Sequence, residues 1–239
     1  MTSNRAARNA LLVMSAALML LTLYLVFLWV PTEKNLGISQ RIFYFHVAQA
    51  WVGFFAFFWV VVGSVGYLWK RSRACDRLAY ASAEIGMLFT TLMLVTGVTW
   101  AKPAWGVWWT WDPKLTTSLI LWLIYAAYLM LRAYSPPGDQ GSRFAAILGI
   151  VGFVDVPIIY LSVVWWRTVH PPLVVGPAAT GALEPSMRMV LMVATIAFTF
   201  LFAYLLLERL SLRRSEEETD RARVSVEYAA PVHRAMEGS

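Results

Sequence analysis

The sequence predicts an all-α membrane protein built as a bundle of six transmembrane helices. The chain of 239 residues is 59% hydrophobic and only 14% charged, and its mean hydropathy is +0.59. Six apolar segments are each close to the roughly 20 residues that a helix needs to cross a bilayer. This composition is typical of polytopic membrane proteins and excludes a soluble globular domain.

The six predicted spans follow one another along the chain, at about 10–30, 47–69, 80–100, 115–131, 144–164 and 187–207. The first span follows two arginines, as a signal peptide does, but its apolar run is too long and no small-residue cleavage site follows it. We therefore expect residues 1–208 to form a transmembrane domain. The Arg- and Glu-rich residues 209–239 are predicted to form a polar cytoplasmic tail, mobile or weakly helical.

Lysine and arginine are divided unevenly between the two sides of the predicted bundle. Eleven flank the side that carries both termini, even before the rest of the tail is counted, and six flank the other side. Because basic residues are enriched in cytoplasmic loops, both termini are predicted to be cytoplasmic. The connections 31–46, 101–114 and 165–186 then face outward, and they contain two of the three histidines.

Several functions are excluded by what the sequence lacks. The single cysteine, Cys75, rules out an internal disulfide, a CxxC redox pair and a CxxCH site for haem attachment. There is no GxxxxGK[ST] phosphate loop, so an ATP-driven step would belong to another subunit. The net charge of +6 comes mainly from cations beside apolar segments, where topology explains them, so no nucleic-acid partner is expected.

The connection between the third and fourth spans is unusually rich in tryptophan. The stretch from Trp100 to Pro113, WAKPAWGVWWTWDP, contains five tryptophans. Tryptophan is large and mostly apolar with one N–H, so such a stretch belongs at a membrane surface or against a flat apolar ligand. The simpler interpretation is an aromatic belt that anchors helix ends, and the more specific one is a platform for a planar cofactor.

The spacing within this connection predicts local structure. Trp105, Trp108, Trp109 and Asp112 lie at i, i+3, i+4 and i+7, which favours a short surface helix with all four on one face. Asp112 before Pro113 is also a common start for a helix, so Asp112 is expected to cap the fourth span.

Two histidines flank the Trp-rich connection. His46 lies where a connection enters the second span, and a helix N-terminus keeps an imidazole neutral, as a metal ligand must be. His170 precedes two prolines, which predicts a fixed break with Trp166 one helical turn behind it. Each histidine alone is compatible with a hydrogen-bonded interfacial residue. Together they suit the two axial ligands of an iron porphyrin, whereas zinc fits less well because the outer connections offer no cysteine and no third histidine.

Four charged residues complete the candidates. Arg41 and Lys114 are the outer cations best placed to meet haem propionates, although both could be snorkelling interfacial residues. Glu84 and Asp155 lie within predicted spans, where acidic residues are functional candidates. Glu84 is close enough to the inner end to reach water, whereas Asp155 lies deeper, two residues before Pro157, and could bond across helices.

These residues carry a family resemblance. WGVWWTWDPKLT resembles the "WWD" signature of the cytochrome c assembly family of haem-handling proteins, and RIFYFHVAQAW and SVVWWRTVHPP resemble its two flanking histidine motifs. In length and in number of spans, the chain most resembles the CcmC branch of that family, the haem exporter proteins C. The resemblance implies haem b held by His46 and His170 as axial ligands. It also implies presentation of that haem by the WWD segment, with basic loop-edge positions at Arg41 and Lys114; the segment comprises Trp105, Trp108, Trp109, Trp111 and Asp112.

The resemblance further implies partners and a location. It suggests delivery of haem to the membrane-anchored chaperone CcmE, association with the ABC proteins CcmA and CcmB and with CcmD, and no enzymatic activity. The haem site would face the periplasm from a bacterial inner membrane. Two positions depart from the family pattern: Ala48 replaces a frequent proline, which loosens the expected helix start, and Lys114 replaces a frequent arginine.

Two other functions remain open from the sequence. Cytochrome c synthases of the CcsA or ResC type share the WWD signature, but they usually have more spans and further histidines inside them. A transporter of a substrate other than haem would need a lined path through the bilayer and would not depend on the two histidines. The spans show two acidic residues but no polar stripe.

Overall fold

The computed structural model describes residues 2–135, 139–166, 168–172 and 183–237. A π-turn at Leu25–Trp29 extends the first helix, and a 3-10 turn at Ile38–Arg41 precedes the second. The α-helices are α1 (Thr2–Tyr24), α2 (Ile42–Lys70), α3 (Arg73–Trp105), α4 (Pro113–Tyr134), α5 (Asp139–Phe153), α6 (Asp155–Trp165) and α7 (Pro185–Glu237). Within the described residues, six helical segments are long and apolar enough to cross a membrane. The all-α class and the six spans are therefore confirmed.

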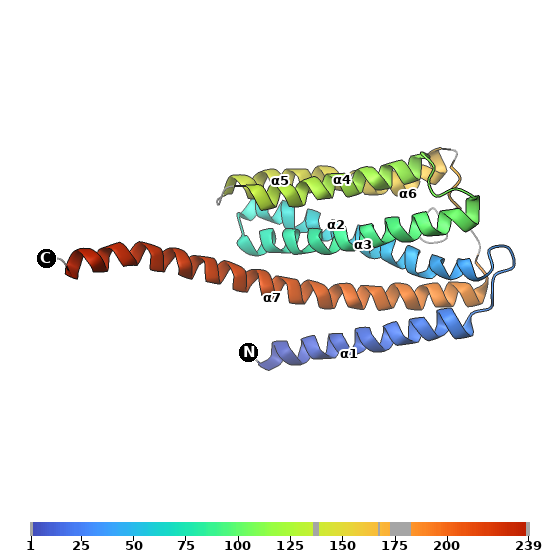
Figure 1. Cartoon of the computed structure of the whole chain (residues 1–239), viewed down its shortest axis with the longest axis horizontal. Helices are drawn as coiled ribbons and strands as arrows, with labels where there is room; N and C mark the ends of the chain where they lie inside the picture. Colours follow the sequence, from blue (N-terminus) through green and yellow to red (C-terminus); the bar gives the residue numbers. More distant parts are fainter. Residues whose placement is uncertain (1, 136–138, 167, 173–182, 238–239) are drawn as a thin grey trace.

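The helices form an up-and-down bundle with both termini at the same end (Figure 1). α2 and α3 lie in the middle, α4, α5 and α6 lie on one side of them, and α1 and α7 lie on the other. We call the opposite end, with the connections 30–41, 106–112 and 168–172, the outer end of the bundle. Parts of all three predicted outer connections meet there.

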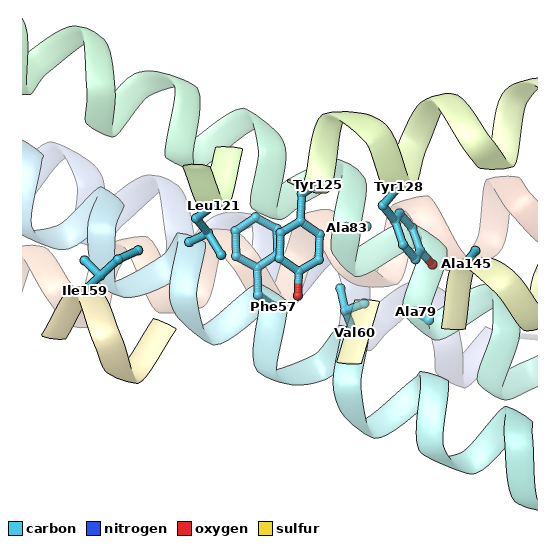
Figure 2. Close-up of a cluster of buried hydrophobic side chains, with 9 residues drawn as sticks. All are labelled: Phe57, Val60, Ala79, Ala83, Leu121, Tyr125, Tyr128, Ala145 and Ile159. Atoms are coloured by element: carbon cyan, nitrogen blue, oxygen red, sulfur yellow. The ribbon is translucent and has the colours of Figure 1, made fainter. Parts of the chain in front are cut away.

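An aromatic pair forms the centre of the core between α2 and α4 (Figure 2). Phe57 stacks on Tyr125 with ring centroids 3.6 Å apart and planes inclined by 8°. The Tyr125 hydroxyl donates to the carbonyl oxygen of Gly149 on α5 at 2.9 Å. A Cβ on Gly86 would lie 2.5 Å from the Phe57 ring, so α3 can approach α2 this closely only with glycine there.

The fifth predicted span is divided into two helices. α5 ends at Phe153 and α6 begins at Asp155, where the N–H of Val154 donates to the Val151 carbonyl at 3.1 Å, a tighter turn than an α-helix makes. Pro157 has no N–H for the Phe153 carbonyl, and its ring crowds that carbonyl, so the break follows from proline geometry. The two helices still serve as one span, Asp139–Trp165.

The polar C-terminal segment continues the last spanning helix. α7 runs from Pro185 to Glu237, so the polar segment predicted from residue 209 is helical as far as residue 237. Pairs of opposite charge one turn apart, such as Arg214 with Glu218 at 2.9 Å, favour the helical state there. Contacts with other helices also hold its first turns, because Arg77 of α3 pairs with Glu217 at 2.9 Å.

Candidate functional site

His46 lies inside α2 and faces α3. α2 begins at Ile42, about five residues before the predicted start, because the apolar run before His46 joins the helix after the 3-10 turn. The Nδ1 atom of His46 lies 3.0 Å from the Met93 carbonyl oxygen and 3.1 Å from the Thr96 hydroxyl. His46 therefore lies in the second turn of α2 and not in the connection before the helix, where it was predicted. Ala48 is fully buried in the same helix and does not mark its start.

His170 lies after the end of α6. Trp166 has an extended backbone with φ −126° and ψ 157°, so the predicted helical turn between Trp166 and His170 does not form. The ring beside His170 is instead Trp105 from the end of α3, at 6.3 Å between centroids. The Nδ1 atom of His170 lies 2.9 Å from the Pro171 carbonyl oxygen. The helix ends at Trp165, before the two prolines and earlier than predicted, and the aromatic neighbour of His170 comes from a distant segment.

The two histidines and Lys114 share one electrostatic environment at the outer end. Burial, together with the positive charge of Lys114, lowers the pKa of His170 to about 3, and His46 contributes in the same direction. Asp112 acts in the opposite direction. Lys114 also acts electrostatically on His46. His46 of α2, Lys114 of α4 and His170 of the segment after α6 are therefore close enough to interact electrostatically.

Asp112 caps α4, as its position before Pro113 predicts. One carboxylate oxygen accepts the N–H of Leu115 at 2.9 Å, and Pro113 is the first helical residue. The other oxygen accepts the hydroxyl of Thr168 at 2.5 Å. The Thr168 hydroxyl oxygen in turn accepts the backbone N–H of His170 at 3.1 Å. Asp112 therefore fixes the start of α4 and the segment that carries His170.

The Trp-rich connection is not a surface helix. α3 continues to Trp105 and ends at Gly106, whose φ of 77° is left-handed, and no helix resumes before Pro113. The predicted single face is therefore wrong, because Gly106 breaks the spacing argument at its first step. Trp105 and Trp109 are half-buried. Two further rings point outward: Trp108 is 56% exposed and Trp111 is 75% exposed.

The remaining charged candidates lie in different surroundings. Arg41 is the last residue of the 3-10 turn before α2, and its guanidinium carbon lies 5.9 Å from the centre of the Phe27 ring. Glu84 accepts from Arg209 at 2.7 Å and pairs with Arg213 at 2.5 Å, so its partners belong to α7. One carboxylate oxygen of Asp155 is buried and has no hydrogen-bond partner among the described residues.

The chemistry of these residues fits a haem better than a bare metal ion. Within the described ranges, no group of three or more His, Cys, Asp or Glu side chains could hold a metal ion. Several buried polar atoms near this end also have no partner among the described residues, and a ligand could satisfy them: Nε1 of Trp100, Nε1 of Trp109, Oγ1 of Thr110, Oγ1 of Thr116 and Nε of Arg41. Two imidazoles, aromatic walls and unpaired donors suit a planar anionic macrocycle.

Sequence reasoning missed the residues that hold the histidines. Thr96, Gly97 and Gln49 lie beside His46, and Thr168 supports His170. The one signal was Gln49, a polar residue on the same face of an apolar helix one turn after His46. Nothing local marks the other three, because their partners are distant in the sequence.

Comparisons with known proteins agree with the resemblance in the sequence. The family model for heme exporter protein C (CcmC) matches residues 1–225. Heme exporter protein C of Bradyrhizobium diazoefficiens is 40% identical over 176 residues, which cover 73% of this chain and 66%, just under two thirds, of that protein. The protein of the same name from Escherichia coli K12 is 37% identical over 182 residues, 75% of this chain and 72% of its own length. A ccmC-like mitochondrial protein of Marchantia polymorpha, named for cytochrome c biosynthesis, is 35% identical over 175 residues, 73% of this chain and 74% of its own length.

Proposed function

The chain belongs to the heme exporter protein C (CcmC) family, and from this premise we propose that it binds haem at the outer end of the bundle and delivers it for the biogenesis of c-type cytochromes. The observation that carries the proposal is that His46 and His170, far apart in the sequence, both lie against the end of α3, His46 beside Trp100 and His170 beside Trp105, at 6.2 and 6.3 Å between ring centroids. A haem iron takes two such imidazoles as axial ligands.

The hydrogen bonds of the two rings support this role. The Nδ1 atoms of His46 and His170 lie against the backbone carbonyls of Met93 and Pro171. This leaves Nε2 of each ring for the iron, in the arrangement that protein histidine ligands usually adopt. A bound haem b would supply an iron with two axial positions inside a flat apolar ring.

The surroundings suit the rest of the haem molecule. The half-buried rings of Trp105 and Trp109 provide apolar walls for the macrocycle. Lys114 is close enough to both histidines to affect them electrostatically, so its ammonium is the proposed partner of a propionate. Arg41 is the second proposed partner, because its Nε is buried without a partner among the described residues.

The exposed rings suggest how haem leaves. Trp108 and Trp111 project from the outer end, where large apolar side chains favour a partner or the membrane surface. We assign to them contact with a haem chaperone of the CcmE type. The chain would act as a carrier and not as an enzyme, in a complex with the ABC proteins CcmA and CcmB and with CcmD.

The proposed orientation places the outer end in the periplasm and both termini in the cytoplasm of a bacterial inner membrane. Cys75 is the sole cysteine, so a Cys75→Ser background allows single-site labelling. In intact spheroplasts, Val107→Cys should react with an impermeant maleimide, and Arg214→Cys should react only after lysis. The reverse pattern would exclude this orientation.

Haem ligation is tested on the protein purified in detergent. The absorption spectrum should show low-spin haem in the unaltered protein and a loss of haem or of the low-spin signature in His46→Ala and His170→Ala. His233→Ala is the control, because His233 lies in the polar C-terminal segment and should leave the spectrum unchanged. A low-spin spectrum that persists in both ligand variants would exclude these two residues as ligands.

A further inference from the structure

One turn of α3 packs against the ring of His46, and we call its residues Met93, Thr96 and Gly97 the seat of His46. The carbonyl oxygen of Met93 and the hydroxyl of Thr96 both lie within hydrogen-bond distance of Nδ1, at 3.0 and 3.1 Å. Gly97, the next residue on α3, lies against the edge of the same ring. A single helical turn therefore offers the imidazole a carbonyl and a hydroxyl as hydrogen-bond partners, and the glycine leaves room for the ring.

The carbonyl determines which nitrogen of His46 carries the proton. A carbonyl oxygen can only accept a hydrogen bond, so the contact with Met93 requires a proton on Nδ1. In the neutral ring, Nε2 then keeps its lone pair. The Thr96 hydroxyl oxygen accepts the same N–H in a shared bond, because its own proton is directed elsewhere.

The hydroxyl of Thr96 also links α3 back to α2, through Gln49. The Thr96 hydroxyl lies 3.1 Å from Oε1 of Gln49, which is buried and stands one turn after His46 on α2. It also lies 2.8 Å from the Leu92 carbonyl on its own helix, a contact that threonines in spanning helices commonly make. Thr99, one turn further along, makes only contacts of this ordinary kind, with Val95 and Thr96.

Gly97 makes the close approach of the ring possible. A Cβ at this position would lie 3.0 Å from Cε1 of His46 and 3.5 Å from Nδ1. Cε1 stands between the two ring nitrogens, so a side chain there would tilt Nε2 as well as weaken the bond at Nδ1. Trp100, one turn further along α3, also lies near this ring, at 6.2 Å between centroids.

We propose that Thr96, Gly97 and Gln49 are positioning residues, which hold His46 in the Nδ1–H tautomer with Nε2 directed to the haem iron. The inference rests on the proposed function, since it assigns a role within the same site. It assigns these residues no contact with the haem itself. Their effect is exerted through one ring, as supporting hydrogen bonds act on metal-binding histidines in general.

The first test uses the haem-free protein in detergent with ¹⁵N-labelled histidine. The His46 signals are assigned by their loss in His46→Ala and should show the Nδ1–H tautomer. Thr96→Val should lower the ratio of Nδ1–H to Nε2–H by about threefold, because it removes one of the two acceptors that share the N–H and leaves the Met93 carbonyl. Thr96→Ser should restore the ratio. Thr99→Val, the matched control, should change nothing. An Nε2–H tautomer in the unaltered protein, or equal effects of Thr96→Val and Thr99→Val, would overturn the proposal.

The second test measures haem binding and reduction potential. Thr96→Val should weaken ferric haem binding by about tenfold. It should also raise the reduction potential of the haem, because the imidazole donates less electron density to the iron when its N–H loses an acceptor. Thr99→Val should leave both unchanged, and a Thr99→Val effect as large as that of Thr96→Val would contradict the assignment. If the protein binds no haem at all, the proposed function fails, but the tautomer measured without haem still decides whether the seat exists.

Discussion

The hydroxyl of Thr168 donates to Oδ2 of Asp112 at 2.5 Å and so joins the Trp-rich connection to the segment that carries His170. The same carboxylate caps α4 through the N–H of Leu115, and the same hydroxyl oxygen accepts the N–H of His170. A single acidic residue therefore sets the position of one proposed haem ligand relative to the tryptophans.

Thr168→Val should separate these roles, because it removes the link and leaves the cap of Asp112 in place. We expect haem affinity to fall by about tenfold and the free energy of unfolding to fall by about 1 kcal/mol, measured by haem titration and thermal unfolding in detergent. Thr117→Val is the control, since its hydroxyl bonds only carbonyls of its own helix. Unchanged haem affinity in Thr168→Val would show that the link does not position His170.

Lys114→Met should raise the pKa of His170. The ammonium of Lys114 disfavours a second positive charge and is one cause of the lowered pKa, so its removal shifts the pKa upward from about 3. The value should stay below 6.5 because burial remains the larger cause. An NMR titration of the haem-free protein measures the shift. Lys102→Met removes an exposed cation that bonds the Gly106 carbonyl, and an equal shift in both variants would contradict the role of Lys114.

The parts of the site that were predictable from the sequence depend on short segments. The cap at Asp112 needs only residues 112–115, whereas the end of α6 at Trp165, well before the two prolines, was not predicted. The prediction of a surface helix over the Trp-rich connection was wrong, and the reason is also local. The spacing of the aromatic residues was counted through Gly106, which adopts the left-handed conformation that ends a helix.

The parts that were not predictable join distant segments. His46 meets Met93 and Thr96 across two helices, and Thr168 meets Asp112 across 56 positions. Apolar periodicity indicates which segments are helices, but it does not give the register in which two helices pack. The helix pair that forms the seat for His46 therefore appears only in three dimensions.

Glu84→Gln should affect stability and leave haem ligation unchanged. Glu84 holds two arginines of α7, Arg209 and Arg213, and its side chain is 25% exposed. Loss of the charge leaves both guanidinium groups with a weaker partner, so we expect a loss of about 1–2 kcal/mol in the free energy of unfolding, discounted for solvent screening. Glu218→Gln, which breaks one exposed pair with Arg214, should cost less. A changed haem spectrum in Glu84→Gln would instead give this acidic residue a role in the haem site.

Gly106→Ala should weaken haem binding through the backbone alone. Gly106 has φ +77°, and a Cβ there would meet nothing within 4 Å, so the cost is the roughly 1–2 kcal/mol of a left-handed conformation for a residue with a side chain. Relief of that strain moves the end of α3, and with it Trp105, away from His170. Gly106→Asn should bind haem more tightly than Gly106→Ala, because asparagine tolerates this conformation.

Gly37→Ala is the matched control: Gly37 also has a positive φ, +59°, and open space around it, but it lies in the first outer connection. Both alanine variants should lower the unfolding temperature in detergent, and only Gly106→Ala should lower haem affinity in a titration. Equal losses of haem affinity would mean that the end of α3 has no special role in placing Trp105 beside His170.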